Sequence, residues 1–315
     1  MPDSSLTTTA PSAAQAQPAS LSRQGFTAAV GAFLIWGLFP LYLVELKHIS
    51  ALEITAHRVA WSFFFVLLWM AARGELGKLR EAAAGPGVLL RLAFTAFLVT
   101  INWLAFVWGV NNERTVEVSL GYYINPLFNV LLGILVLSER LNRTQWIAVT
   151  LAAIGVTHLT IEAGHLPWIA QTLAVSFSTY GFIRKTANVE ALPGLAIEMM
   201  LLAPLAIGFL IWCEMRGTAA FTHSSAWIEV LLVISGVVTA LPLYLFAYGA
   251  RRIPYSTVGI LQFIGPSLQL ACAVFVFGEP FDQGRLLGFV LIWAAPAVYA
   301  ADGLWRSPGA GNTCG

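Results

Sequence analysis

Long apolar runs recur along this chain of 315 residues, and they constrain its fold more than any other feature. Runs of about 18–25 such residues are long enough to cross the ~30 Å hydrocarbon core of a bilayer as an α-helix. The chain is 58% hydrophobic and 10% charged, whereas a typical soluble domain is about 25% charged. A soluble fold of this size could not cover so much apolar surface. The sequence therefore predicts an integral membrane protein.

Polar breaks divide the apolar sequence into ten predicted helices. The five in the first half cover about residues 26–45, 51–72, 87–110, 115–137 and 144–161. The five in the second half cover about residues 167–185, 193–213, 226–249, 255–277 and 284–303. The break at Lys47 and His48 is the weakest, so one bent hairpin there is the alternative. The predicted fold class is an all-α membrane protein with ten transmembrane helices.

Lys and Arg are distributed unevenly over the breaks. The side that carries the N-terminus holds Arg23, Arg73, Lys78, Arg80, Arg140, Arg143, Arg184, Lys185, Arg251, Arg252 and Arg306, and the other side holds Lys47, Arg114, Arg216 and Arg285. By the positive-inside rule, both termini lie in the cytoplasm. Residues 1–24 contain no apolar core of a signal peptide and are predicted to be a disordered cytoplasmic tail. Residues 306–315 form a second, short tail.

One sequence pattern occurs twice, 140 positions apart. The first copy starts with Gly-Tyr-Tyr-Ile-Asn-Pro at 121–126, and the second starts with Leu-Gln-Phe-Ile-Gly-Pro at 261–266. Each copy continues through an apolar stretch to a glutamate, Glu139 or Glu279, with no change in spacing. The pattern predicts two repeats of five helices each, at residues 25–161 and 162–305.

The number of helices in each repeat determines how the two repeats face. Because five is odd, the second repeat enters the membrane from the side opposite to the first. Inverted repeats of this kind are typical of secondary transporters, whose substrate site lies at the interface between the repeats. Duplication that only stabilises a helix bundle is the alternative.

Two prolines occupy equivalent positions in the two repeats. Pro126 and Pro266 lie near the middle of the fourth and ninth predicted spans. A proline there removes a backbone hydrogen bond, and non-helical backbone at membrane depth is tolerated where it is buried in protein or lines a wet cavity. We therefore predict helix breaks at both prolines and a cavity centred on Tyr122, Asn125, Gln262 and Gly265. Two purely structural kinks are the alternative.

Several other side chains inside the spans are candidates for the wall of this cavity. Arg58 requires a partner or water, because a charged side chain is costly inside a membrane; Glu117 and the freed carbonyls are its predicted partners, and a structural ion pair is as plausible as a substrate contact. Asn102 either lines the cavity or joins two helices. Trp36 and Tyr180 are a repeat-matched aromatic pair, which forms either a cavity wall or a helix crossing.

Four titratable side chains could carry a coupling proton or form ion pairs: Glu53, His57, Glu117 and Glu198. A structural role is the stronger alternative for His57. Glu139 and Glu279 are predicted to anchor neighbouring loops. Three scattered cysteines and no clustered ligands predict no metal site and no cofactor, and a net charge of +1 predicts no nucleic-acid partner.

The motifs resemble one known family. His57-Arg58-Val59-Ala60-Trp61, Asn102-Trp103 and Ser119-Leu120-Gly121-Tyr122-Tyr123-Ile124-Asn125-Pro126, followed by Ser138-Glu139-Arg140, are similar to the RarD family of EamA-type transporters in the drug/metabolite transporter superfamily. The resemblance covers about residues 25–305. It implies two EamA repeats, the inner membrane of a bacterium, and export or permeation of small metabolites or drugs. It implies no residue-level substrate site.

The sequence thus favours a secondary transporter that works by alternating access, with proton coupling as a further hypothesis. The expected partners are a small-molecule substrate and membrane lipid. A homodimer is a further possibility that the sequence leaves undecided. No catalytic motif occurs, so an enzyme is not predicted. The alternatives are a membrane partner or sensor subunit that transports nothing itself and, less favoured, a membrane-embedded enzyme.

Overall fold

The computed structural model describes residues 22–111, 114–162, 168–278 and 283–305, and these ranges contain helices and turns but no strand. The elements of the first half are α1 (Arg23–Leu43), the 3₁₀ turn η1 (Val44–Leu46), α2 (Ala51–Ala72), α3 (Gly77–Ala84), α4 (Val88–Asn111), α5 (Thr115–Leu135) and α6 (Arg143–Glu162). Those of the second half are α7 (Trp168–Thr186), α8 (Ala191–Met215), α9 (Ala226–Ala250), α10 (Tyr255–Gln262), α11 (Ile264–Ala271), the π-helical turn η2 (Cys272–Val276) and α12 (Gln283–Trp305).

Each predicted span falls on helical structure, with two differences. The break predicted after residue 72 contains the short helix α3, which is polar and has no buried residue. The segment predicted as one helix at 255–277 is divided into α10, α11 and η2, with a turn at Phe263. In the described residues, seven segments are long and apolar enough to cross a membrane. The protein is therefore a multi-pass membrane protein.

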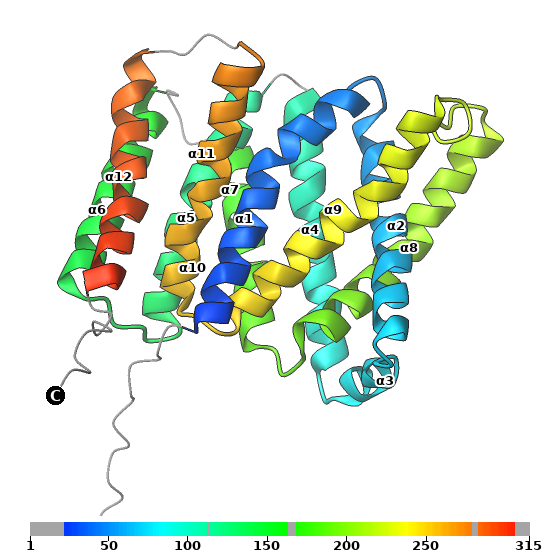
Figure 1. The fold of residues 1–315 in the computed structure, drawn as a ribbon, viewed down its shortest axis with the longest axis horizontal. Helices are drawn as coiled ribbons and strands as arrows, with labels where there is room; N and C mark the ends of the chain where they lie inside the picture. Colours follow the sequence, from blue (N-terminus) through cyan, green and yellow to red (C-terminus); the bar gives the residue numbers. More distant parts are fainter. Residues whose placement is uncertain (1–21, 112–113, 163–167, 279–282, 306–315) are drawn as a thin grey trace, which may run out of the picture.

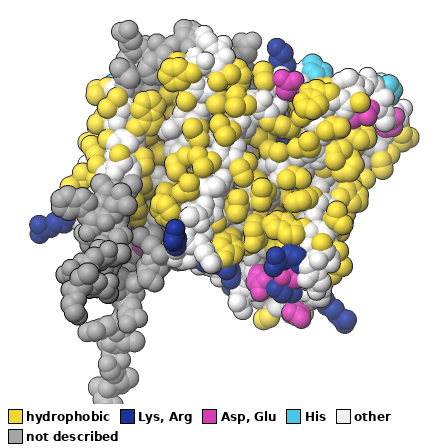
Figure 2. Space-filling model, in the orientation of Figure 1, with side chains coloured by type: hydrophobic (Ala, Val, Ile, Leu, Met, Phe, Trp, Pro, Cys, Tyr) yellow, Lys and Arg dark blue, Asp and Glu magenta, His cyan; other side chains and the backbone are white. Residues whose placement is uncertain are grey.

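The helices stand side by side, with α6 and α12 at one end of the long axis and α2 and α8 at the other (Figure 1). The first turn of α1 and the last turn of α12 lie at the same edge. On the face shown in Figure 2, hydrophobic side chains cover the middle, whereas charged side chains gather along the two edges. This distribution is the one expected of helices whose middle faces lipid and whose ends face water.

Equivalent helices of the two halves pack in equivalent ways. Three helices contact their own counterpart: α2 packs against α8, α5 against α10, and α6 against α12. In addition, α1 packs on α9 and α11 in the same way that α7 packs on α4 and α5. The duplicated sequence is thus matched by an approximately symmetric set of helix contacts.

The helix ends repeat as well. Gly74 after α2 and Gly217 after α8 both have positive φ, +67° and +66°, as is usual where a glycine ends a helix. Ser138 after α5 and Gly278 after η2 are also left-handed, with φ of 55° and 69°. Ser138 therefore turns the chain at the position equivalent to Gly278, although a side chain is rarely stable in that conformation.

This turn directs Glu139 at the start of α10. Its two carboxylate oxygens accept hydrogen bonds from the backbone N–H of Tyr255 (2.6 Å) and Ser256 (2.9 Å) and from the Ser256 hydroxyl (2.7 Å). A negative charge is favourable at a helix N-terminus, where N–H groups lack partners. The prediction that Glu139 anchors a neighbouring segment is confirmed. Glu279 lies outside the described residues.

We expect Glu139→Ala to lower the free energy of unfolding by about 2 kcal/mol, because two backbone donors and a hydroxyl lose a charged acceptor. Thermal unfolding in detergent measures the loss, and Arg140→Ala, at the exposed neighbouring position, is the control. Equal stability of the two variants would contradict the capping role.

Helices approach closely where glycines lie in the crossings. A Cβ atom on Gly155 of α6 would lie 2.7 Å from the carbonyl oxygen of Gly288 in α12. A Cβ atom on Gly236 of α9 would overlap the backbone of Trp61 in α2, and the Ser62 hydroxyl donates to the Gly236 carbonyl at 3.0 Å. Small residues at such positions allow van der Waals packing and backbone contacts between membrane helices.

Candidate functional site

A cavity of about 160 Å³ lies between helices of both halves. Aromatic side chains form the largest group in its wall, and a few polar side chains lie among the rings. The lining residues are Phe33, Trp36, Phe39, Pro40, Leu43, Arg58, Asn102, Trp103, Phe106, Tyr122, Phe177, Thr239, Leu243, Gln262, Gly265, Pro266 and Gln269. An apolar pocket with few convergent polar groups is the usual form of a small-molecule site.

Five of the seven predicted substrate-binding residues lie in this wall: Trp36, Arg58, Asn102, Tyr122 and Gln262. The other two do not. Asn125 is buried behind the wall, where it bonds to Gln262 and to α7. Tyr180 is buried and stacks on Phe246. Neither side chain lines the cavity, because both face neighbouring helices; for Tyr180 this agrees with the alternative of a helix crossing.

Arg58 is the charged group of the cavity. Its Nε donates to the Thr239 hydroxyl of α9 at 2.9 Å, and its guanidinium carbon lies 4.9 Å from the ring centre of Phe39 and 5.1 Å from that of Trp103. In the described part of the chain no carboxylate lies within ion-pair distance of it. The side chain of Glu117, its predicted partner, lies outside the described residues.

An amide network joins the halves beside the cavity. Gln262 Nε2 donates to Asn125 Oδ1 at 2.8 Å, and Gln262 Oε1 accepts a short hydrogen bond from Asn129. Asn102 Nδ2 donates to the Leu173 carbonyl and to the Ser176 hydroxyl, each at 3.0 Å. Asn102 therefore both lines the cavity and joins α4 to α7. The Gln262 amide is occupied by protein partners at both ends.

We expect Gln262→Leu to destabilise the protein by about 1–3 kcal/mol, because it leaves the buried Asn129 amide without its acceptor. Thermal unfolding in detergent measures the loss. Gln269→Leu is a suitable comparison, since Gln269 lines the same cavity but donates a single bond, to the Trp36 carbonyl. If Gln262→Leu were no less stable than Gln269→Leu, the network would not hold the halves together.

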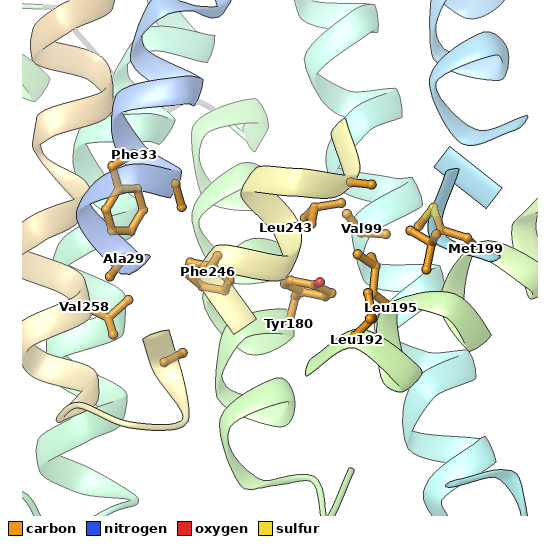
Figure 3. Packing of buried hydrophobic residues seen from close by; sticks show 14 of the residues in the cluster. Ala29, Phe33, Val99, Tyr180, Leu192, Leu195, Met199, Leu243, Phe246 and Val258 are labelled. Carbon is orange, nitrogen blue, oxygen red and sulfur yellow. The ribbon is translucent and has the colours of Figure 1, made fainter. Parts of the chain in front are cut away.

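A packed hydrophobic cluster closes the cavity on one side. Phe33 and Leu243 belong to both the cavity wall and the cluster. Figure 3 shows how Phe246 and Tyr180 lie next to one another, with Leu195 and Met199 of α8 beyond them. On the side of Phe33 and Leu243, the interior next to the cavity is therefore filled by side chains.

A fully buried ion pair lies beyond this cluster. Arg184 of α7 and Glu198 of α8 are each 1% exposed, with Nε and Oε1 3.6 Å apart. Glu198 accepts hydrogen bonds from Thr95 (2.6 Å) and Tyr180 (3.4 Å), and Arg184 Nη2 donates to the Ala191 carbonyl at 2.7 Å. The pair joins α4, α7 and α8.

Sequence reasoning placed Arg184 in a loop and missed this pair. Glu198 lies inside the next predicted span, and a carboxylate inside a membrane span requires a cation nearby. This requirement was the one indication of the pair in the sequence. Helical spacing alone cannot show which cation approaches it, because Arg184 comes from a different helix.

Glu53 and His57, two of the other predicted coupling residues, lie near the start of α2 and do not line the cavity. Glu53 is buried and accepts a short hydrogen bond from the backbone N–H of Ala220 before α9. His57 is buried against Phe221, and within the described residues neither ring nitrogen has a hydrogen-bond partner. These positions hold α2 against the segment between α8 and α9.

The cavity continues toward this same end. A second pocket of about 350 Å³ shares Leu43, Arg58, Trp103 and Phe106 with the first and reaches Lys47 and Ser50, between α1 and α2. The central cavity thus adjoins a pocket that leads to one edge of the molecule, while the hydrophobic cluster and the Arg184–Glu198 pair occupy the other side.

The two prolines differ in their effect. Helix α5 continues from Thr115 to Leu135 through Pro126, so the break predicted at that proline is wrong. In the second half the helix is divided at Phe263, three residues before Pro266. The helix is interrupted in only one of the two repeats, and the phenol of Tyr123 donates to the Pro266 carbonyl at 3.3 Å.

Comparison with known proteins gives consistent matches. The sequence model of the EamA-like transporter family matches residues 23–161 and 168–299. An uncharacterized transporter of Pseudomonas aeruginosa is 44% identical over 285 residues, covering 90% of this chain and 95% of that protein. Protein RarD of Escherichia coli is 40% identical over 287 residues, covering 91% and 97%. A solved crystal structure has a TM-score of 0.67 and 16% identity, covering 90% of this chain and 98% of its own, which shows the fold alone.

Proposed function

The chain belongs to the EamA-like transporter family, and we propose that it is a secondary transporter that carries small organic molecules through the central cavity. The observation that carries the proposal is the position of this cavity. It lies between the two halves and is lined by aromatic rings, with Arg58 and Tyr122 among them. In transporters built from repeats, substrates bind near the middle of the membrane at the interface between the repeats.

We infer ten membrane-spanning segments in two inverted repeats, with residues 25–161 and 162–305 as the repeats. Both termini then lie in the cytoplasm of a bacterial cell, because the basic loops gather on their side. The symmetric helix contacts support this arrangement. Labelling with a membrane-impermeant thiol reagent tests it: in a cysteine-free background, Ser225→Cys is expected to react from outside the cell and Ser138→Cys only after lysis. Reaction of both from one side would contradict inverted repeats.

Alternating access is the mechanism we propose for the transport. The pocket toward Lys47 and Ser50 offers a route from the cavity to the outer edge. The cluster around Phe246 and Tyr180 fills the route to the inner edge. If the two equivalent halves exchanged conformations, the pocket toward Lys47 and Ser50 would close and the cluster around Phe246 and Tyr180 would separate. The cavity would then open to the cytoplasm.

Transport itself can be tested without a known substrate. Proteoliposomes that contain the purified protein are loaded with a bacterial metabolite extract, and mass spectrometry follows the compounds that leave. We expect a small set to leave faster than from protein-free liposomes. Equal release of every compound from both preparations would contradict the proposal.

Proton coupling is a separate part of the proposal, motivated by Glu53, His57, Glu117 and Glu198. Glu198 is buried and accepts a hydrogen bond from Tyr180, whose ring contacts Phe177 of the cavity wall. Efflux of the compounds identified above is expected to change when a pH gradient is imposed. A rate independent of the gradient would exclude the proton and leave facilitated transport.

A further inference from the structure

Arg58 places a cation in the wall of the central cavity, and no carboxylate of the described residues neutralises it. We propose that its ligand is a small organic monocarboxylate with a single flat apolar ring; this inference rests on the transport function proposed above. Arg58 would bind the carboxylate, and the aromatic wall would hold the ring.

The contacts of Arg58 leave one part of the guanidinium available. Phe39 and Trp103 lie at cation–π distance from it, and Nε is held by Thr239. No hydrogen bond from its terminal Nη groups to a described residue is present, and the side chain is partly exposed and lines the cavity. A guanidinium held in this way presents a planar pair of donors, which match the two oxygens of a carboxylate.

The charge balance points in the same direction. The deeply buried Arg184 is neutralised by Glu198, whereas Arg58 has no carboxylate partner among the described residues. A charged side chain at this depth is costly, and such residues mark substrate pathways when they face a cavity. An anionic ligand would supply the missing counter-charge.

Tyr122 adds a second donor. It lines the same cavity and lies within electrostatic range of Arg58. Its hydroxyl forms no hydrogen bond to the part of the chain that is described, although its ring packs on Phe106 at 6.1 Å. The hydroxyl is therefore available to a carboxylate oxygen.

Size and lining define the rest of the ligand. The volume of about 160 Å³ is close to that of an apolar cavity of about 150 Å³ known to hold benzene. Trp36, Phe106 and Phe177 provide ring surfaces. No acidic side chain lines the cavity among the described residues, so an ammonium group would find no carboxylate there and would be repelled by Arg58. The cavity thus favours a simple carboxylate over an amine or an amino acid.

The test compares four probes of one ring each on the detergent-purified full chain: benzoate, benzamide, benzylamine and phenylalanine. Thermal unfolding and tryptophan fluorescence measure binding. Benzoate is expected to raise the unfolding temperature and to change the fluorescence of Trp36 and Trp103, whereas neutral benzamide, which has nearly the same shape, does neither. Sodium sulfate and sodium chloride test whether an inorganic anion alone gives the same response.

Two variants locate the effect. Arg58→Gln is expected to weaken benzoate binding roughly 10- to 100-fold, the loss of one charged hydrogen-bonded contact, and Arg58→Lys is expected to retain part of it. Arg73→Gln, which removes an exposed arginine paired with Glu75, should leave binding unchanged. Because the benzoate–benzamide comparison uses the native chain, it holds even if a variant at Arg58 fails to fold.

Several results would overturn the inference: no response to benzoate, equal responses to benzoate and benzamide, a preference for benzylamine or phenylalanine, or a response to sulfate or chloride alone. The metabolite-efflux experiment separates these from failure of the transport proposal. Efflux restricted to neutral or cationic compounds would refute the carboxylate and leave the transporter intact.

Discussion

Replacing Arg184 with methionine is expected to lower the free energy of unfolding by about 3–5 kcal/mol. The substitution leaves Glu198 1% exposed with hydrogen bonds from Thr95 and Tyr180 but without its cation. A buried ion pair adds little when both charges are present, because each was removed from water; breaking the pair is what costs stability. Unfolding in detergent, followed by tryptophan fluorescence, measures the loss.

The matched variants are Glu198→Leu and the double change. Glu198→Leu is expected to cost a similar amount, since it leaves Arg184 uncompensated. The double variant Arg184→Met/Glu198→Leu removes both charges and is expected to recover most of the loss. A double variant as unstable as the sum of the single ones would show that the two side chains act independently and that their pairing is not what stabilises this end of the bundle.

Gly236→Val is expected to reduce the free energy of unfolding by about 3 kcal/mol. The new Cβ would overlap the backbone of Trp61, so α9 would have to move away from α2, and the bond from the Ser62 hydroxyl to the Gly236 carbonyl would break. Unfolding in detergent measures the effect. The crossing of α2 and α9 is one of the most extensive in the bundle, which leaves little room for adjustment.

Gly208→Val provides the control. Gly208 is also a mid-helix glycine, in α8, but it is exposed and nothing lies within 4 Å of a Cβ placed there. The two variants carry the same change in helix propensity, so their difference reports the crossing alone. Equal stability would mean that α2 and α9 separate at no cost.

Features that depend on local patterns could be predicted from the sequence. Apolar length predicted the helical segments, and the constant spacing from Pro126 to Glu139 and from Pro266 to Glu279 predicted the two halves. The resemblance to the RarD family is confirmed. The aromatic and polar side chains that face one cavity were found because prolines and unpaired polar residues inside spans both indicate wet or buried sites.

Features that depend on which helices meet could not be predicted in this way. The direction of Asn125 and Tyr180 is decided by their neighbours: Asn125 turns to Gln262 and α7, and Tyr180 turns to Glu198. The difference between Pro126 and Pro266 also has no local signal. Both prolines follow an isoleucine two residues earlier, yet the helix is divided only in the second half, at Phe263.

The Arg184–Glu198 pair is a departure from the internal duplication. Glu198 has a counterpart in Glu53, but at the spacing that relates Tyr180 to Trp36, the counterpart of Arg184 is Pro40. Among the described residues, this end of the bundle therefore holds a buried ion pair that the equivalent segment of the first half does not repeat. If the chain works by the alternating access proposed above, opening this end would have to break the pair, which is costly. An empty transporter is then expected to rest mainly with this end closed and the cavity open to the other side.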